Sequence, residues 1–240
     1  IKGDALFVSD IHLTESDPSS IDNFQQFLLQ ECSKNPNLFI LGDLFDYWIG
    51  DDSLHFKKLQ KVFTEISDNT KIFFICGNRD FLVGDNFFKK TKINSLPDES
   101  VITVDGKEII LMHGDSLCTD DKDYQEFRKL SRSREWKKEF LSKSLDERLE
   151  ICLQLRKKSE MAKSMKEEAI MDVNLTSVEK VFSKYNYPTF LIHGHTHRLK
   201  THHHLINDHN CQRWVLGDWE RRANYIELKE GKLKYRYINS

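Results

Sequence analysis

The sequence Thr189-Phe190-Leu191-Ile192-His193-Gly194-His195-Thr196-His197 joins a run of strand length to closely spaced histidines. Residues 189–192 are apolar or β-branched, as expected of a buried strand. The alternating histidines come directly after this strand, where imidazoles have few structural uses. The stretch therefore predicts a strand that delivers imidazole ligands to a metal ion.

Four other segments repeat this arrangement of an apolar run followed by polar residues. The runs are residues 5–8, 38–41, 71–76 and 108–112, and the segments after them are Asp10-Ile11-His12, Gly42-Asp43, Gly77-Asn78-Arg79-Asp80 and His113-Gly114-Asp115. One Asp-x-His or Gly-Asp alone is more often a turn or a cap than a metal site, but all five segments in this order are not expected by chance. Strands that alternate with helices over residues 1–114 predict an α/β fold, whose sites form beyond the carboxyl ends of the strands.

The number of candidate ligands predicts two metal ions. The seven candidate side chains are Asp10, His12, Asp43, Asn78, His113, His195 and His197. They are too many for one ion that keeps a position open for water, but two ions can use all of them if one carboxylate bridges the pair. Bridged ions lie about 3.5–4 Å apart, a spacing that assists displacement at phosphorus.

Asp43 is the expected bridge, because it is central in the motif order and has two oxygens. Asp10, His12, Asp43 and His197 are then assigned to one ion, and Asp43, Asn78, His113 and His195 to the other. Oxygen and nitrogen ligands without thiolate favour Mn²⁺, with Fe or Zn as alternatives.

The segment from Asp115 to Tyr187 contains neither Gly nor Pro and predicts several helices between the fourth and fifth metal segments. An apolar stripe predicts that these helices pack against the body of the protein: Phe127, Leu130, Phe140, Leu141, Leu145, Leu149, Cys152 and Leu153. A lid over about residues 121–175, with an apolar inner face for a ligand, is the functional alternative. The basic residues around Trp136 (Arg132, Arg134, Lys137 and Lys138) suit either a solvated helix face or contact with an anionic membrane leaflet.

Length and composition fit one enzyme domain over residues 1–240, with two or three further strands expected in residues 199–240. A net charge of −2 provides no basic field, so nucleic acid is not an expected partner. No apolar run approaches the length of a membrane span, and no signal pattern is expected at the start. Five irregularly spaced cysteines favour reduced thiols in a cytoplasmic protein.

The pattern D-x-H, G-D, G-N-[HR]-[DE], H-G and G-H-x-H, from Asp10 to His197, resembles the calcineurin-like metallophosphoesterase superfamily. The resemblance implies a four-layer αββα sandwich with a helical lid insertion. Within the superfamily, four segments resemble the UDP-2,3-diacylglucosamine pyrophosphohydrolase family: residues 77–81, 113–121, 169–174 and 193–198.

This resemblance implies hydrolysis of UDP-2,3-diacylglucosamine in lipid A biosynthesis. Water attacks the α-phosphorus, and the products are UMP and 2,3-diacylglucosamine 1-phosphate (lipid X). It also implies two divalent ions, with Mn²⁺ expected, a nucleotide-linked diacyl lipid as partner, and peripheral association with the cytoplasmic face of the inner membrane. No obligate protein partner is expected.

The resemblance also assigns roles to individual residues. Asn78, Arg79 and His195 are expected to be catalytic. The expected substrate contacts are Asn78, Arg79, Asp121, Ser159, Lys163, Lys166 and His195. Lys163 departs from the family pattern, which usually has Asn or Thr at this position.

Arg79 connects this family to a mechanism. Many superfamily members have His here, which can protonate a leaving alkoxide, whereas arginine remains protonated and cannot act as a general acid at neutral pH. Its planar fork can instead bind phosphate oxygens and stabilise developing charge. Arg79 thus favours a leaving group that departs without a proton, such as a phosphate from a pyrophosphate. Alternatively, Arg79 only pairs with Asp80 or another carboxylate.

Two other functions compete. A metallophosphoesterase for nucleotides or phosphoproteins would need a shallower site and would gain little from a long apolar insertion. A non-catalytic scaffold of the same fold would be expected to lose ligands, and here all seven are present.

Overall fold

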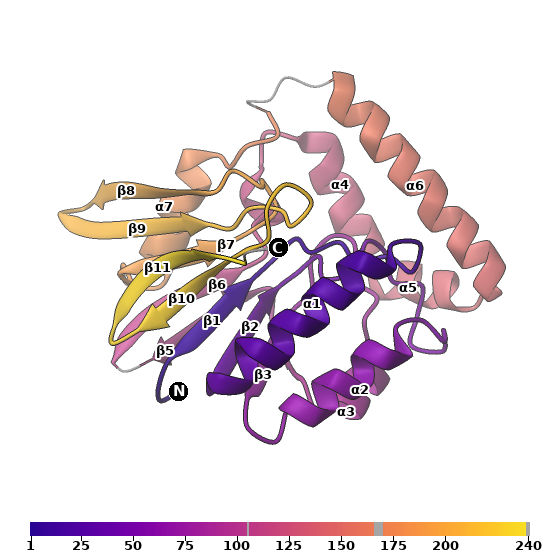
Figure 1. The fold of residues 1–240 in the computed structure, drawn as a ribbon. Helices are drawn as coiled ribbons and strands as arrows, with labels where there is room; N and C mark the ends of the chain where they lie inside the picture. Colours follow the sequence, from indigo (N-terminus) through magenta and orange to yellow (C-terminus); the bar gives the residue numbers. More distant parts are fainter. Residues whose placement is uncertain (105, 166–169, 239–240) are drawn as a thin grey trace.

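Two β-sheets lie face to face with helices on their outer sides (Figure 1). The structure is a computed structural model that describes residues 1–104, 106–165 and 170–238, without the side chains of residues 163–165. The first sheet has the strand order β11-β10-β1-β2-β3-β4, and the second has the order β5-β6-β7-β9-β8. The predicted αββα sandwich is confirmed.

The five predicted strands are parallel neighbours within their sheets. They are β1 (Ala5–Val8), β2 (Asn37–Leu41) and β3 (Lys71–Ile75) in the first sheet, and β6 (Lys107–Met112) and β7 (Phe190–His193) in the second. The remaining strands are β4 (Asn94–Leu96), β5 (Glu99–Val104), β8 (Lys200–Ile206), β9 (His209–Val215), β10 (Asn224–Lys229) and β11 (Lys232–Tyr237). Residues 199–238 thus form four strands, where two or three were predicted.

The predicted strands are mainly apolar because most of their residues are buried on both faces, except at the exposed starts of β3 and β6. Along β1, Phe7 faces the second sheet, whereas Leu6 and Val8 face the helices. In β6, Ile109 and Leu111 fill the layer between the sheets. Ile110 packs on the other side, with Phe182 of α7 (Leu175–Lys184).

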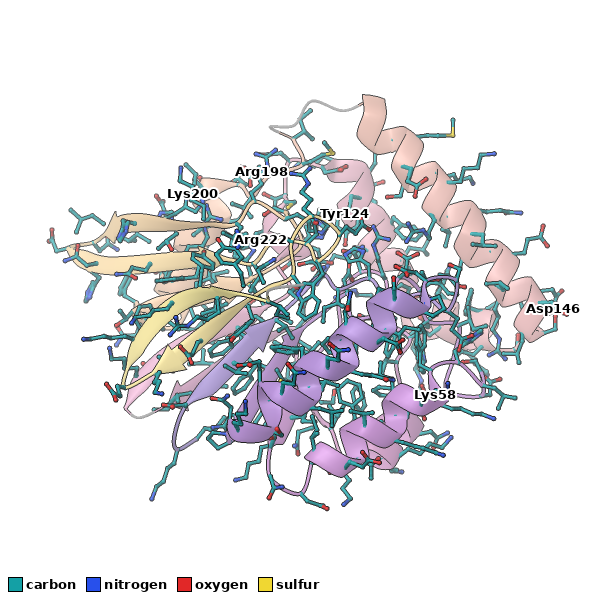
Figure 2. The ribbon with its side chains drawn as sticks, viewed as in Figure 1. Lys58, Tyr124, Asp146, Arg198, Lys200 and Arg222 are labelled. Carbon is teal, nitrogen blue, oxygen red and sulfur yellow. The ribbon has the colours of Figure 1, made fainter. Side chains whose placement is uncertain are left out.

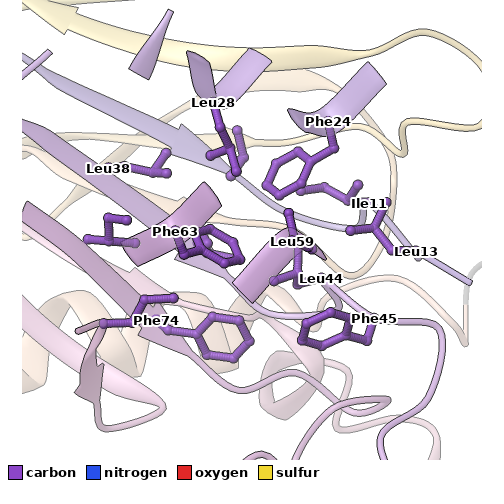
Figure 3. Close-up of a cluster of buried hydrophobic side chains, with 14 of the residues drawn as sticks. Ile11, Leu13, Phe24, Leu28, Leu38, Leu44, Phe45, Leu59, Phe63 and Phe74 are labelled. Atoms are coloured by element: carbon purple, nitrogen blue, oxygen red, sulfur yellow. The ribbon is translucent and has the colours of Figure 1, made fainter. Parts of the chain in front are cut away.

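Three helices cover the outer face of the first sheet: α1 (Pro18–Gln30), α2 (Lys57–Ile66) and α3 (Asp85–Thr91). Figure 3 shows Phe24 of α1 and Phe63 of α2 in one cluster with Leu38 and Phe74 from the strands. The short 3₁₀ segments η1 (Cys32–Lys34) and η2 (Asp115–Leu117) complete the connections. This packing fixes the strand ends from which the polar segments emerge.

Helices lie between β6 and β7, as predicted. They are α4 (Lys122–Ser131), α5 (Arg134–Leu141), α6 (Leu145–Met165) and α7. The side chains of Asp121 and Ser133 accept hydrogen bonds from the backbone N–H groups of Tyr124 and Trp136, and so begin α4 and α5. The helix α6 runs along the outside of α4 and α5 (Figure 1).

The apolar stripe of this insertion is only partly buried. Phe140 is 2% exposed, but four leucines are not buried: Leu130 (58% exposed), Leu141 (40%), Leu145 (38%) and Leu153 (51%). The prediction that the stripe packs against the body is wrong for these four leucines, whereas Phe140 and Cys152 of the stripe do pack against the core. The helix α6 also contacts the body through the buried Arg148 and the partly buried Ile151. In the described part of the chain, no helix combines the length and the apolar character that crossing a membrane requires.

Candidate metal and active site

The predicted polar segments meet at one edge of the two sheets. Asp10 and His12 follow β1, Asp43 follows β2, and Asn78 follows β3. The second sheet contributes the residues after β6 and β7, which are His113, His195 and His197. The backbone N–H of His195 donates to Asp10 Oδ2 at 2.9 Å, so the two sheets are joined inside the site.

Two glycines allow this close approach. A Cβ atom at Gly77 would lie 2.1 Å from Asp43 Oδ1, and one at Gly194 would lie 2.1 Å from Asp10 Oδ2. Real Cβ atoms do not approach other atoms so closely. Both positions therefore require glycine if the two carboxylates are to keep their places.

Five of the seven predicted ligands have a left-handed backbone. The φ angles of Asp10, His12, Asp43, His195 and His197 lie between 53° and 65°. This conformation costs on the order of 1–3 kcal/mol for a residue other than glycine, and such strain concentrates at functional sites. The backbone strain thus marks the same residues as the sequence motifs.

One group of possible ligands consists of Asp10, His12 and His197, whose ligand atoms all lie within 4.8 Å of one another. His197 Nε2 is 3.2 Å from Asp10 Oδ1, and His12 Nε2 is 3.7 Å from the same oxygen. Among the described residues, neither ring nitrogen of His12 has a hydrogen-bond partner, although both are buried. A cation at this place would satisfy the buried lone pair of His12, which otherwise carries a desolvation cost.

A second group surrounds the Asn78 side chain. Its oxygen accepts hydrogen bonds from His113 Nε2 at 2.9 Å and from His195 Nδ1 at 2.8 Å. Asp43 lies between the two groups, since its Oδ2 is 3.9 Å from His12 Nε2 and its Oδ1 is 3.6 Å from His113 Nε2. The two oxygens of one buried carboxylate thus face different histidines, as a bridging ligand would require.

The electrostatics of the site favour positive charge. Burial alone lowers the pKa of His113, but Asp43 and Asp10 outweigh burial and raise this pKa to about 9. Burial likewise opposes protonation of His197, whose contacts with carboxylates nevertheless raise its pKa to about 9. Burial and the neighbouring His113 lower the pKa of His195 to about 4. The carboxylates therefore attract cations, and a bound metal ion would take the place of the proton on His113 and His197. His195 is already neutral, the form in which an imidazole binds a metal.

The residues present fit divalent metal ions. Carboxylate, imidazole and amide atoms converge, and none of the free cysteines is in the group. The site also contains a buried imidazole, His12, that has no hydrogen-bond partner among the residues that the structure describes. Such oxygen and nitrogen donors suit Mn²⁺, Fe or Zn. They can hold ions beside a phosphate and lower the pKa of a bound water.

Arg79 lies at the edge of this site. Its Nη1 donates to Asp46 Oδ1 at 2.5 Å, and its Nε is 3.5 Å from Asp43 Oδ2. The alternative that Arg79 pairs with a carboxylate has a partner in the structure, but that partner is Asp46. Asp80 is buried and accepts from the N–H groups of Leu44 and Gly77.

The other predicted substrate contacts do not gather at the metal site. Asp121 caps α4, and Ser159 is exposed on α6. The side chain of Lys163 and the whole of Lys166 lie outside the described residues. The structure thus brings Asn78 and His195 into the site and Arg79 to its edge, but it does not place all of the predicted substrate contacts there.

The sequence interpretation missed several residues around the site. Asp218 Oδ2 is 3.4 Å from His197 Nδ1, the ring nitrogen that faces away from Asp10. Its signal was available, because Leu216-Gly217-Asp218 repeats the pattern of Leu41-Gly42-Asp43 after a strand.

Asp115 and Tyr124 were also missed. Figure 2 labels the Tyr124 side chain of α4. Its ring stacks on His195 at 5.8 Å between centroids, and its hydroxyl donates to Asp115 Oδ2. Arg128 Nε and Arg132 Nη2 donate to the same oxygen at 2.8 and 3.0 Å. These contacts connect α4 to the strand end that carries His113.

Comparisons with known proteins show which proteins this chain resembles. The family model of calcineurin-like phosphoesterases matches residues 4–199. A UDP-2,3-diacylglucosamine hydrolase of Aromatoleum aromaticum is 43% identical over 225 residues, which cover 92% of this chain and 91% of the relative. One of Edwardsiella ictaluri is 40% identical and covers 93% of this chain and 87% of the relative. Among solved structures, an archaeal phosphodiesterase aligns with 98% of each chain at 14% identity and a TM-score of 0.47.

The fold and the converging ligands define a calcineurin-like phosphoesterase, a class of metal-dependent hydrolases. Within this class, the chain belongs to the family of its curated relatives, the UDP-2,3-diacylglucosamine hydrolases.

Proposed function

We propose that this chain hydrolyses the pyrophosphate bond of UDP-2,3-diacylglucosamine and releases UMP and 2,3-diacylglucosamine 1-phosphate in lipid A biosynthesis. The observation that carries the proposal is the complete ligand set in a chain 43% identical to a hydrolase of that name. A nucleotide or phosphoprotein hydrolase of the same fold has no comparable support.

The chain supplies the ligands and the anion contacts. Asp10, His12, Asp43 and His197 would hold one divalent ion, and Asp43, Asn78, His113 and His195 the other. Bound Mn²⁺ ions supply an acidified water and neutralise charge on phosphate oxygens. Arg79 stabilises the negative charge that develops as water attacks the α-phosphorus, and a phosphate leaves without needing a proton.

The insertion supports a lipid substrate. Exposed leucines on α4, α5 and α6 give the helices between β6 and β7 apolar surface that the body does not cover. Such surface is suited to acyl chains, with Asp121, Ser159, Lys163 and Lys166 as substrate contacts from the same segment. The insertion acts as a lid, and the protein associates peripherally with the cytoplasmic face of the inner membrane, from which a diacyl lipid is taken.

A substrate series tests the proposal. Burial of acyl chains contributes about 0.8 kcal/mol per CH₂, so kcat/KM should rise steeply with acyl length and then reach a plateau. The series compares UDP-2,3-diacylglucosamine, its monoacyl relative and the bare UDP-sugar, with protein treated with a chelator and reloaded with Mn²⁺. Equal turnover of acylated and bare substrates would contradict the lipid assignment and leave a nucleotide-sugar hydrolase.

A further inference from the structure

Asp46 connects the helix α6 of the insertion to the edge of the metal site. Its Oδ1 accepts from Arg79 Nη1 at 2.5 Å and from Arg156 Nη1, and its backbone oxygen is 3.4 Å from the same Arg156 nitrogen. Arg79 follows β3, whereas Arg156 lies on α6. One carboxylate oxygen thus accepts hydrogen bonds from two guanidinium groups that belong to different elements.

These groups can be reached from solvent and border the metal ligands. The side chains of Asp46, Arg79 and Arg156 are 16%, 20% and 28% exposed. Arg79 Nε is 3.5 Å from Asp43 Oδ2, and His12 Nδ1 is 3.8 Å from Asp46 Oδ1. A phosphate group held at the predicted ligands would therefore lie beside the donors that Asp46 occupies.

The charge balance favours exchange of one anion for another. Both guanidinium groups share Asp46, and their other carboxylate contacts among the described residues are longer: Asp43 lies 3.5 Å from Arg79 Nε, and the exposed Glu160 lies 3.2 Å from Arg156. Phosphate oxygens fit the guanidinium fork at least as well as a carboxylate does. An incoming phosphate can thus take the place of Asp46 as the partner of both arginines.

The start of α6 is held by a separate contact. Arg148 is 6% exposed and donates to the carbonyl oxygens of Ile49, Leu141 and Lys143 at 2.7–3.1 Å. It also donates to Asp52 Oδ1 at 2.7 Å. Release of Arg156 would therefore affect α6 beyond this anchored turn and leave the anchored turn in place.

We propose that Asp46 is a positioning residue that holds Arg79 and Arg156 together when no phosphate is bound and releases both to an incoming phosphate. Asp46 thereby keeps α6 docked beside the site until phosphate binds and competes with the substrate for its anion contacts. The inference rests on the proposed function only in requiring a substrate that contains phosphate.

Calorimetric titration of inorganic phosphate into the metal-loaded protein tests the competition. Loss of a competing ion pair worth about 1 kcal/mol should lower the phosphate Kd of Asp46→Asn about fivefold. Asp46→Glu should keep the wild-type Kd, and so should the control Glu160→Gln, which removes only the exposed partner of Arg156. In a protein that already carries Arg156→Gln, Asp46→Asn should lower the phosphate Kd by less than it does in the wild type. An unchanged or higher Kd in Asp46→Asn would overturn the proposal.

Hydrogen exchange separates this role from a purely structural one. In Asp46→Asn without phosphate, amides of residues 157–165 should exchange faster than in the wild type, and phosphate should slow them again. Amides of residues 148–152 should not change, because Arg148 still anchors them. Failure of phosphate to restore protection would contradict the exchange of partners.

A second variant keeps the test decisive if Asp46→Asn does not fold. Arg156→Gln should weaken phosphate binding about fivefold and speed exchange in residues 157–165, with no recovery on adding phosphate. Wild-type phosphate affinity in Arg156→Gln would overturn the proposal. Neither measurement uses hydrolysis of the lipid, so failure of the proposed function would not be mistaken for failure of this inference.

Discussion

Replacement of Arg79 by alanine should remove a stabiliser of transition-state charge without removing a metal. The side chain of Arg79 reaches Asp46 and the edge of Asp43, but it is not among the ligands. Its backbone N–H donates to Asp43 Oδ1 at 2.9 Å, and alanine keeps this hydrogen bond. Asp43 should therefore stay oriented, and Arg79→Ala should bind the same amount of metal as the parent protein.

The expected loss of activity follows from the role of the guanidinium group. Removal of one donor to a developing oxyanion lowers kcat about 10²–10³-fold, or about 2.7–4 kcal/mol of transition-state stabilisation. The ion pair with Asp46 is partly exposed, so its loss should cost the fold no more than about 1 kcal/mol. A large fall in kcat with almost unchanged stability is the signature of a catalytic contact.

The assay compares the parent protein, Arg79→Ala and Arg79→His on UDP-2,3-diacylglucosamine and on an alkyl phosphodiester, with metal content and Tm measured in parallel. Arg79→His should not rescue the pyrophosphate substrate, because its leaving phosphate gains little from a proton. Arg79→His should hydrolyse the alkyl phosphodiester faster than Arg79→Ala does, because protonation greatly assists the departure of an alkoxide. Full activity of Arg79→Ala on the lipid would show that Arg79 is merely a partner for Asp46.

Three further substitutions test the site and its supports. Asp218→Asn weakens the carboxylate contact to His197, so metal affinity by calorimetry should fall about 10–100-fold while the fold is kept; unchanged affinity would refute the orienting role. Gly77→Ala places a Cβ 2.1 Å from Asp43 Oδ1, so the amount of bound metal measured by elemental analysis should drop. The control Gly106→Ala adds a Cβ that meets nothing within 4 Å, and this variant should retain its metal. Burial raises the pKa of Asp115, but its arginine partners outweigh burial and hold this pKa below the ordinary value. The ionised form therefore stabilises the fold above the unfolded pKa of about 3.9. Asp115→Asn should cost about 3 kcal/mol in urea unfolding at pH 7 and less as the pH falls below 4, and a pH-independent difference would contradict this assignment.

The central strands were predictable because their environment leaves a simple pattern. Residues of β1, β2 and β7 are buried on both faces, so their sequences are continuous apolar runs that stop where the ligands begin. The C-terminal strands were harder to predict. Buried and exposed positions mix along β8, with His203 exposed between two partly buried histidines, and the number of strands was underestimated.

The ligands were predictable one segment at a time, but their supporting residues were not. Asp46 meets Arg156 across 110 positions of sequence, a distance that no periodicity reveals. Aspartates in loops often cap helices or lie in turns. The roles of Asp46 and Asp218 therefore become clear only from the residues that surround them in the structure. The exposed leucines could not be predicted either, because the sequence of an apolar stripe does not reveal whether the body of the protein or a ligand covers it.

The most direct test of the central claim is the position of ¹⁸O after hydrolysis of UDP-2,3-diacylglucosamine in labelled water. With Mn²⁺-loaded protein, mass spectrometry should find one ¹⁸O in UMP and none in the 2,3-diacylglucosamine 1-phosphate, because water attacks the α-phosphorus. Chelated protein should give neither product until metal is restored. Label in the lipid phosphate, or cleavage that survives removal of the metal, would contradict the account.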